Sequence, residues 1–176
     1  MVDYPRGVKN TIALLEGADV DFDILPHITM NGTKSTDASQ ALEVNIDQIL
    51  KVLIGKTRKK TFFCAILLGN QQFRKDKLKK ILNTRVDRLA QKKEIEELIG
   101  FSPGSVPPVG LPEIPCIIDS EVMKKDFIIG SAGSPYYGLK LTPQILVDMN
   151  HNVTIADIAE KTPTSEVNTS IESHNK

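Results

Sequence analysis

Three stretches of the sequence combine residue types that could do chemistry. Lys51 stands inside the apolar run "QILKVLIG", where an ammonium group is costly to bury unless it is paired or its charge is used. The loop "GSVPP", residues 104–108, joins a glycine to two prolines, and "GSAG", residues 130–133, is a second glycine-rich turn. A cation beside two stretches of bare backbone could orient a substrate and stabilise a developing negative charge.

The first two features also have purely structural interpretations. Lys51 could lie at a strand end, with its stem packed and its head in water. Residues 104–108 could form a rigid surface connector, because prolines fix φ and reduce the freedom of the unfolded loop. Both alternatives stay open at this point: a cationic pocket rimmed by backbone, or a strand-end lysine and a stiff loop.

Common catalytic motifs find no match in the sequence. "GSAG" has neither the G-x-S-x-G spacing of a nucleophile elbow nor the pattern of a P-loop or a dinucleotide-binding turn. A Ser–His pair built from Ser131 and His151 is possible on residue types, but no spacing supports it. Because the three histidines, His27, His151 and His174, are dispersed, we expect no metal site.

The composition of the chain limits the number of domains and the kinds of ligand that can be expected. The chain of 176 residues, with 40% hydrophobic and 25% charged residues, is globular and long enough for one sizeable core, so we expect a single domain. Because 22 Lys and Arg balance 22 Asp and Glu, any polyanion site must be a local patch. The clusters "KTRKK" and "RKDKLKK" either contact a phosphate backbone or are a solvated turn and a solvated helix face. The candidate phosphate contacts within them are Lys59, Lys60, Lys75 and Lys79.

The cellular environment can also be predicted. Cys64 and Cys116 lie in separate apolar runs, which favours reduced core thiols over a disulfide framework. The segment "MVDYPRGVKN" lacks the apolar region of a signal peptide, and no apolar run approaches the ~18 residues of a membrane span. We therefore expect a cytoplasmic protein without a membrane partner.

Periodicity predicts the elements that must position these residues. Helices are expected over 5–17, 34–44 with Ser35 or Thr36 as N-cap, 73–82, 91–100 and 142–150. Strands are expected over 20–25, 48–55, 61–69, 85–90, 114–119, 126–133 and 137–141, and "VTIADIA" closes the fold. Helices and strands do not alternate strictly, which favours an α+β fold with a mixed or barrel-like sheet. The domain is expected to span 1–161, and residues 162–176 are predicted to form a polar flexible tail.

The features occur in the order, and at about the separations, seen in a known family. "DASQALEVNIDQILKVLIG" resembles the YbaK signature, in which a helix and a turn deliver a lysine to the head of a strand. "LIGFSPGSVPPVGLPEIPCIIDSEV" resembles the family's G-x-x-x-P loop segment, and "DFIIGSAGSPYYGLKLTPQIL" resembles its final glycine turn and last helix. The resemblance covers roughly residues 5–160 and implies the fold of the prolyl-tRNA synthetase-associated editing domain, a single α+β domain whose mixed barrel-like sheet is surrounded by helices.

The resemblance implies a trans-acting aminoacyl-tRNA deacylase, which hydrolyses the ester of mischarged tRNA and so protects translation fidelity. Lys51 then corresponds to the catalytic lysine, and no metal or organic cofactor is implied. The implied partners are mischarged tRNA and, secondly, an aminoacyl-tRNA synthetase. The implied substrate-binding residues are His27, Gly104, Ser105, Val106, Pro107, Pro108, Ser131, Ala132 and Gly133.

Two positions depart from the family pattern. His27 stands where the members nearest YbaK carry a tyrosine, and Lys140 stands where they carry an aspartate. The last glycine turn is also longer than in those members and holds Pro135, Tyr136 and Tyr137. In the family pattern these positions line the amino-acid pocket or its rim, so specificity for cysteine does not carry over. His27 is either a polar pocket residue or a partly exposed structural histidine. A non-catalytic module that binds aminoacyl-tRNA or a synthetase is the alternative to the enzyme.

Overall fold

The computed structural model describes residues 2–27 and 32–163. Its helices are α1 (Arg6–Gly17), α2 (Ser35–Leu42), α3 (Lys75–Leu82), α4 (Lys92–Ile99) and α5 (Pro143–Asp148), with short 3-10 helices η1 (Ile46–Gln48) and η2 (Val122–Lys124). Its strands are β1 (Asp23–Pro26), β2 (Leu50–Thr57), β3 (Phe62–Leu68), β4 (Gln71–Phe73), β5 (Val86–Leu89), β6 (Cys116–Asp119), β7 (Ile128–Ser134), β8 (Tyr137–Leu141), β9 (Val153–Ala156) and β10 (Ala159–Lys161).

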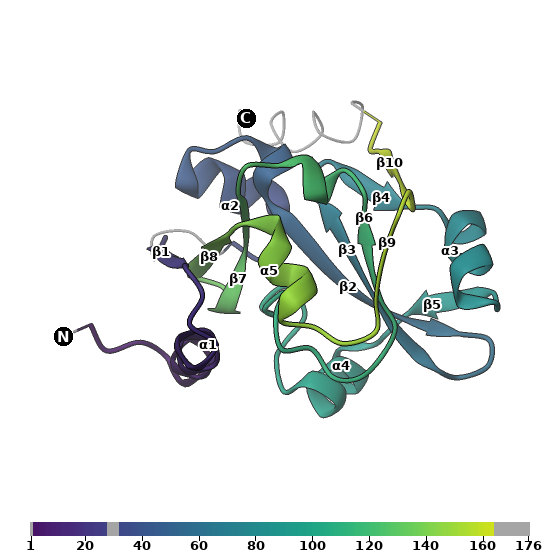
Figure 1. Cartoon of the computed structure of the whole chain (residues 1–176), viewed down its shortest axis with the longest axis horizontal. Helices are drawn as coiled ribbons and strands as arrows, with labels where there is room; N and C mark the ends of the chain where they lie inside the picture. Colours follow the sequence, from purple (N-terminus) through teal and green to yellow (C-terminus); the bar gives the residue numbers. More distant parts are fainter. Residues whose placement is uncertain (1, 28–31, 164–176) are drawn as a thin grey trace, which may run out of the picture.

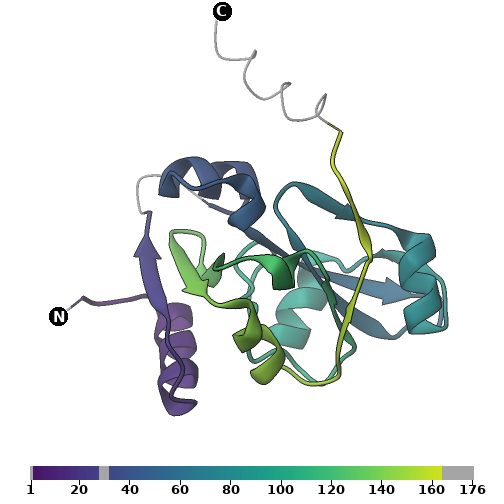
Figure 2. The same ribbon diagram turned by 45° about the horizontal axis from the view of Figure 1, so that its top comes forward.

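The described strands form three sheets (Figure 1). The largest has the order β5-β2-β3-β6-β9 and is mixed, because β6 runs parallel to both β3 and β9 while the other pairs are antiparallel. A three-stranded antiparallel sheet, β1-β8-β7, is joined to it by a parallel bridge between Ile49 and Ile129. Strands β10 and β4 pair separately. The expected α+β class with a mixed sheet is confirmed, and Figures 1 and 2 show α1 and α3 at opposite ends of the domain.

Strand β3 is apolar at nearly every position because both of its faces are buried. Ile66 belongs to the main core, together with Leu139 of β8 and Leu146 of α5. Leu67 belongs to a second core that also contains Leu78 of α3. Burial on both faces explains why this run shows no polar alternation.

The start of α2 and the end of the described chain differ from the sequence-based expectation. The N-cap of α2 is Lys34, whose backbone is extended, so Ser35 is already helical and neither predicted residue caps the helix. The closing segment is not one element, because it divides into β9 and β10, and β10 pairs with β4, which the sequence did not predict. These strands have four, three and three residues, too few for a reliable period.

The expected tail begins in a described part of the chain. The N–H of Thr162 donates to the carbonyl oxygen of Asn70 at 2.8 Å, which continues the pairing between β10 and β4 by one residue. The remainder of the predicted tail, residues 164–176, lies outside the described residues.

Candidate active site

A cavity of about 170 Å³ lies between the start of β2, helix α2 and the β7–β8 hairpin. Apolar side chains of α2 and β7, including Ala38, Leu42 and Ile129, form part of its wall. The predicted site residues that line it are His27, Lys51, Gly104, Val106 and Ser131. Residues separated by more than 100 positions in sequence are thus brought to one cavity.

Lys51 is the second residue of β2 and is partly buried. Its Nζ donates a hydrogen bond to the main-chain oxygen of Gln71 at 2.7 Å. Burial lowers the pKa of Lys51 because the ammonium loses solvation. Lys51 therefore contributes to the cavity lining, and its amine has a main-chain carbonyl as a hydrogen-bond partner.

The loop of residues 104–108 meets the cavity through its first half. Gly104 has a φ of +78°, and a Cβ at this position would lie 2.9 Å from the Cβ of Thr33. Both features require glycine, since other residues are strained in this region and the neighbour leaves no space. Gly104 and Val106 line the cavity, whereas Ser105 lines an adjoining groove.

The second half of the loop is buried support. Pro107 and Pro108 are buried, and the Pro108 carbonyl accepts a hydrogen bond from Nδ2 of Asn150 at 2.7 Å. A Cβ at Gly130 would lie 2.8 Å from the Pro108 ring, so glycine permits β7 to approach the loop. The loop is therefore fixed between two elements and is more than a surface connector.

Residues 131–133, predicted as a glycine turn, belong to the end of strand β7, and they lie in three different surroundings. Ser131 lines the cavity, and its Oγ accepts a hydrogen bond from the N–H of Gly133 at 3.1 Å. Ala132 is fully buried in the main core, and Gly133 lines the adjoining groove beside Gly7 of α1. Only Ser131 of this predicted trio borders the cavity. The pairing of β7 with β8 shifts register between Ser131 and Ser134, which accounts for the different directions of these residues.

The two departures from the family pattern lie in different places. His27 lines the cavity, is 8% exposed, and has its ring against Gly32. Lys140 lies outside the described lining, and its Nζ is 4.5 Å from the centre of the Phe127 ring. The side chain of Lys140 therefore stacks on an aromatic ring and is not part of the cavity wall itself.

Other lining residues were not among the predicted substrate-binding residues. Ser35, Ser134 and Tyr137 also line the cavity, and Tyr137 packs edge-on against Tyr4 with ring centres 5.5 Å apart. The aromatic pair that follows the glycine turn was the available signal for Tyr137. Neither serine could be distinguished from an ordinary helix or turn serine by its spacing.

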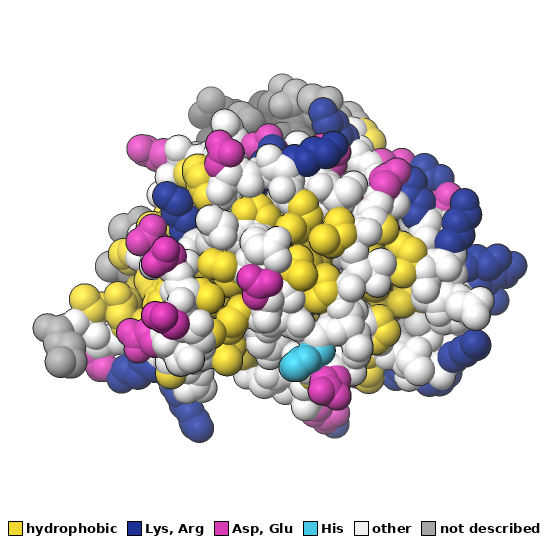
Figure 3. Space-filling view, in the orientation of Figure 1, with side chains coloured by type: hydrophobic (Ala, Val, Ile, Leu, Met, Phe, Trp, Pro, Cys, Tyr) yellow, Lys and Arg dark blue, Asp and Glu magenta, His cyan; other side chains and the backbone are white. Residues whose placement is uncertain are grey.

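The predicted tRNA contacts lie at the other end of β2. Lys59 and Lys60 are exposed in the β2–β3 turn, while Lys75 and Lys79 border a surface groove along α3. Arg58 and Arg85 border the same groove, together with Asp76 and Asp87. Figure 3 shows that Lys and Arg side chains gather at this end of the molecule. Thr57 lies six positions after Lys51, so the cavity and the groove are about 20 Å apart along the strand.

Other expectations concern metals, membranes and thiols. Within residues 2–27 and 32–163, no three His, Cys, Asp or Glu side chains gather as metal ligands would. No helix in that same part of the chain has the length and apolar character needed to cross a membrane. Cys64 and Cys116 are free and buried, and they are register partners on β3 and β6.

The fold and cavity define a small α+β domain with a cavity that a lysine and several glycines line. Residues 29–149 match the model of the aminoacyl-tRNA editing domain family. The match spans more than half of the chain, and the protein belongs to this family.

Relatives and solved structures extend this comparison. The chain is 31% identical over 110 residues to a proline–tRNA ligase of Fervidobacterium nodosum. The aligned segment covers 62% of this chain and 19% of the ligase. The chain thus spans about a fifth of that relative's length. It is 25% identical over 124 residues to a protein of Enterococcus faecalis assigned as the Cys-tRNA(Pro)/Cys-tRNA(Cys) deacylase EbsC, covering 70% of this chain and 75% of that protein.

A structure assigned as a trans-editing enzyme for prolyl-tRNA synthetase superposes with a TM-score of 0.77 at 23% identity. The superposition covers 90% of this chain and 99% of that chain. At this identity the likeness shows the shared fold, and it agrees with the family match.

Proposed function

We propose that the protein is a trans-acting aminoacyl-tRNA deacylase of the prolyl-tRNA editing type, which hydrolyses the ester between a wrong amino acid and tRNA. The observation that carries this proposal is that Lys51, Gly104 and Ser131 line one cavity. Membership of the editing family, and the likeness to EbsC and to proline–tRNA ligases, support it.

The proposed chemistry uses orientation and charge stabilisation. Water adds to the ester carbonyl carbon, and the Lys51 ammonium stabilises the negative charge that develops on the carbonyl oxygen. The bond between the acyl carbon and the ribose oxygen then breaks, and the ribose oxygen takes up a proton. Because an aminoacyl ester is already activated, backbone groups near Gly104 need only hold the ester and the water in place. This mechanism uses no metal and no organic cofactor.

The cavity fits a small aminoacyl group. At about 170 Å³ it is smaller than the roughly 300–1,000 Å³ of an ordinary ligand pocket. His27, Leu42 and Tyr137 would contact the amino-acid side chain, since they lie in its wall. Editing of this kind is expected where a synthetase cannot reject a similar or smaller amino acid by binding alone.

The tRNA body is proposed to lie along the basic end of the domain. Lys59, Lys60, Lys75 and Lys79 would contact phosphates, and none of them forms an ion pair with a described residue. The groove beside the cavity, which Arg6 and Phe101 line, offers room for the terminal nucleotide. A substrate of this class implies a cytoplasmic protein that works beside a synthetase.

The direct test is deacylation of tRNA(Pro) charged with alanine, with cysteine and with proline. We expect release of at least one wrong amino acid and retention of proline. Stable esters in every case, with tRNA still bound, would contradict the proposal and favour a non-catalytic binding module.

A further inference from the structure

The carbonyl that holds Lys51 belongs to a residue fixed by a buried network. The Gln71 main-chain oxygen accepts the Lys51 hydrogen bond, and the Gln71 side chain is itself buried. Its Oε1 accepts a hydrogen bond from the N–H of Leu68 at 3.0 Å. Its Nε2 donates to Oδ1 of Asp119 at 3.2 Å. Gln71 is thus held by its side chain while its carbonyl faces the lysine.

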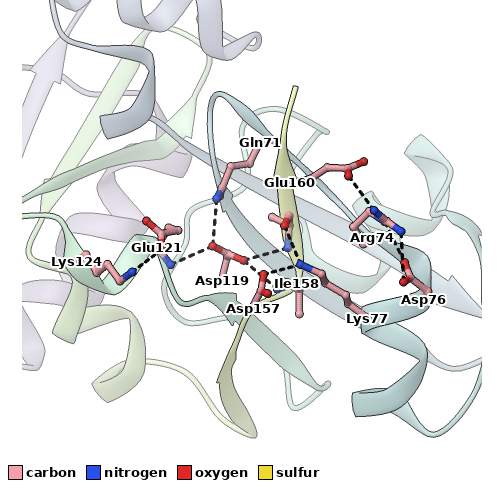
Figure 4. Close-up of polar contacts among 11 residues, drawn as sticks. Gln71, Arg74, Asp76, Lys77, Asp119, Glu121, Lys124, Asp157, Ile158 and Glu160 are labelled. Atoms are coloured by element: carbon pink, nitrogen blue, oxygen red, sulfur yellow. Dashed lines mark hydrogen bonds and ion pairs between the residues drawn. The ribbon is translucent and has the colours of Figure 1, made fainter. Parts of the chain in front are cut away.

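Asp119 is the centre of this network (Figure 4). It is 1% exposed at the end of β6, and its Oδ1 also accepts the N–H of Glu121 at 3.0 Å. Its Oδ2 accepts the N–H groups of Ile158 at 3.0 Å and Ala159 at 3.1 Å. Four N–H donors therefore compensate for the burial of this carboxylate. An asparagine could not replace it fully, because its NH₂ group donates.

The chain beyond the family match completes the arrangement. Residues 157–161 follow the matched segment, which ends at 149, and β10 pairs with β4 so that Lys161 is the register partner of Gln71. The outer edge carries two ion pairs, Arg74 with Glu160 and Lys77 with Asp157 (Figure 4). The carbonyl that holds the lysine is thus supported by Asp119 from within and by β10 at the sheet edge.

We infer that Gln71 and Asp119 are positioning residues for Lys51, which fix the carbonyl that orients its ammonium at the cavity. The inference rests on the proposed function for its catalytic consequence. Lysine has a flexible four-carbon stem, so an anchored hydrogen bond confines the ammonium and leaves its other N–H groups for the substrate. A displacement of about 1 Å at such a group can lower the rate about 10²-fold.

The hydrogen bond between Lys51 and the Gln71 carbonyl can be followed through the pKa of Lys51, because few other titratable groups lie nearby. The other titratable side chains among the described lining residues are His27 and Tyr137, and Asp119 lies behind Gln71. No described Asp or Glu lines the cavity. A hydrogen bond to the carbonyl favours the charged amine, so loosening it should lower the pKa of Lys51 beyond the effect of burial.

The experiment compares Gln71→Ala with Gln72→Ala. The first variant keeps the main-chain carbonyl and removes its link to Asp119, whereas the second removes an exposed side chain on the same strand whose partner is Glu160. The Lys51 amine would be titrated by ¹⁵N NMR without tRNA, with its signal assigned by its loss in Lys51→Ala. Single-turnover deacylation would be measured across pH with the same proteins.

Gln71→Ala is expected to lower the pKa of Lys51, to shift the alkaline limb of the rate profile to lower pH, and to reduce kcat at least about tenfold with KM little changed. Gln72→Ala should match wild type. If Gln71→Ala does not fold, Gln71→Met keeps the apolar packing and serves instead. An unchanged Lys51 titration and kcat would overturn the inference. Because the NMR titration needs no turnover, failure of the proposed function would appear separately, as an absence of deacylation by the wild type.

Discussion

The ammonium nitrogen of Lys51 lies 2.7 Å from the main-chain oxygen of Gln71, a residue 20 positions later in the chain. This hydrogen bond joins the second residue of β2 to the first residue of β4 across the edge of the cavity. The contact gives the lysine a fixed partner that is neutral, so the positive charge stays available to a substrate. The account of the site depends on that charge.

The pH dependence of catalysis should reflect the buried lysine. Because burial lowers the pKa of Lys51, activity should decline at pH values below the ordinary lysine pKa of about 10.4. Between the lowered pKa of Lys51 in the folded protein and its ordinary pKa in the unfolded chain, the unfolded chain binds more protons. Folding stability should therefore rise with pH over this range. Rates corrected for spontaneous ester hydrolysis would show this limb in the wild type. Lys51→Arg should lack it, since guanidinium stays protonated.

The conformation of Gly104 can be tested against a matched glycine. Gly104 and Gly100 have φ values of +78° and +84°, but a Cβ at Gly104 would meet Thr33 whereas one at Gly100 would meet no atom within 4 Å. Gly100→Ala should therefore cost only the backbone strain, about 1 kcal/mol. Gly104→Ala should lose more stability and most of the deacylation rate. Equal stability and activity of the two variants would contradict the assigned role of the loop.

The basic groove should make binding sensitive to salt. If Lys75 and Lys79 contact phosphates, the double variant Lys75→Glu/Lys79→Glu should weaken tRNA binding and reduce the slope of log affinity against log salt. The control is Lys92→Glu/Lys93→Glu, which makes the same charge change on exposed positions of α4. The measurement is the tRNA affinity of both double variants and of the wild type at several salt concentrations. Identical salt slopes for the two double variants would mean that the lysines of α3 face solvent and do not contact tRNA phosphates.

The wall residue His27 should set selectivity more than rate. It is nearly buried beside the space proposed for the amino-acid side chain, so His27→Tyr should change the ratio of kcat/KM between alanyl and cysteinyl esters. His151→Tyr is the control because His151 is exposed and outside the described lining. If neither variant changes the selectivity ratio, His27 does not contribute to the choice of amino acid.

Much of the site could be predicted because its signals are local. A lysine in an apolar strand is energetically anomalous, and a glycine followed by two prolines restricts the backbone wherever it occurs. Both features could be found without knowing the fold. The resemblance then placed Lys51, Gly104 and Ser131 in one site, and the structure brings all three to one cavity.

The supporting network could not be predicted because its contacts are distant in sequence. Asp119 is 48 residues from Gln71 and 39 from Ile158, and β4 and β10 are three residues each. Periodicity cannot identify strands that short, and a carboxylate at the end of an apolar run is also typical of a turn. The contact of Lys140 with Phe127 could not be predicted for a related reason, since it depends on the pairing of β7 and β8.

The most direct test measures release of amino acids from a panel of mischarged tRNA(Pro) species by the wild type and Lys51→Ala in parallel. The account predicts that the wild type deacylates at least one species, and that Lys51→Ala does so at least about 10²-fold more slowly while keeping the wild-type melting temperature. Equal rates for the two folded proteins would contradict the central role of Lys51.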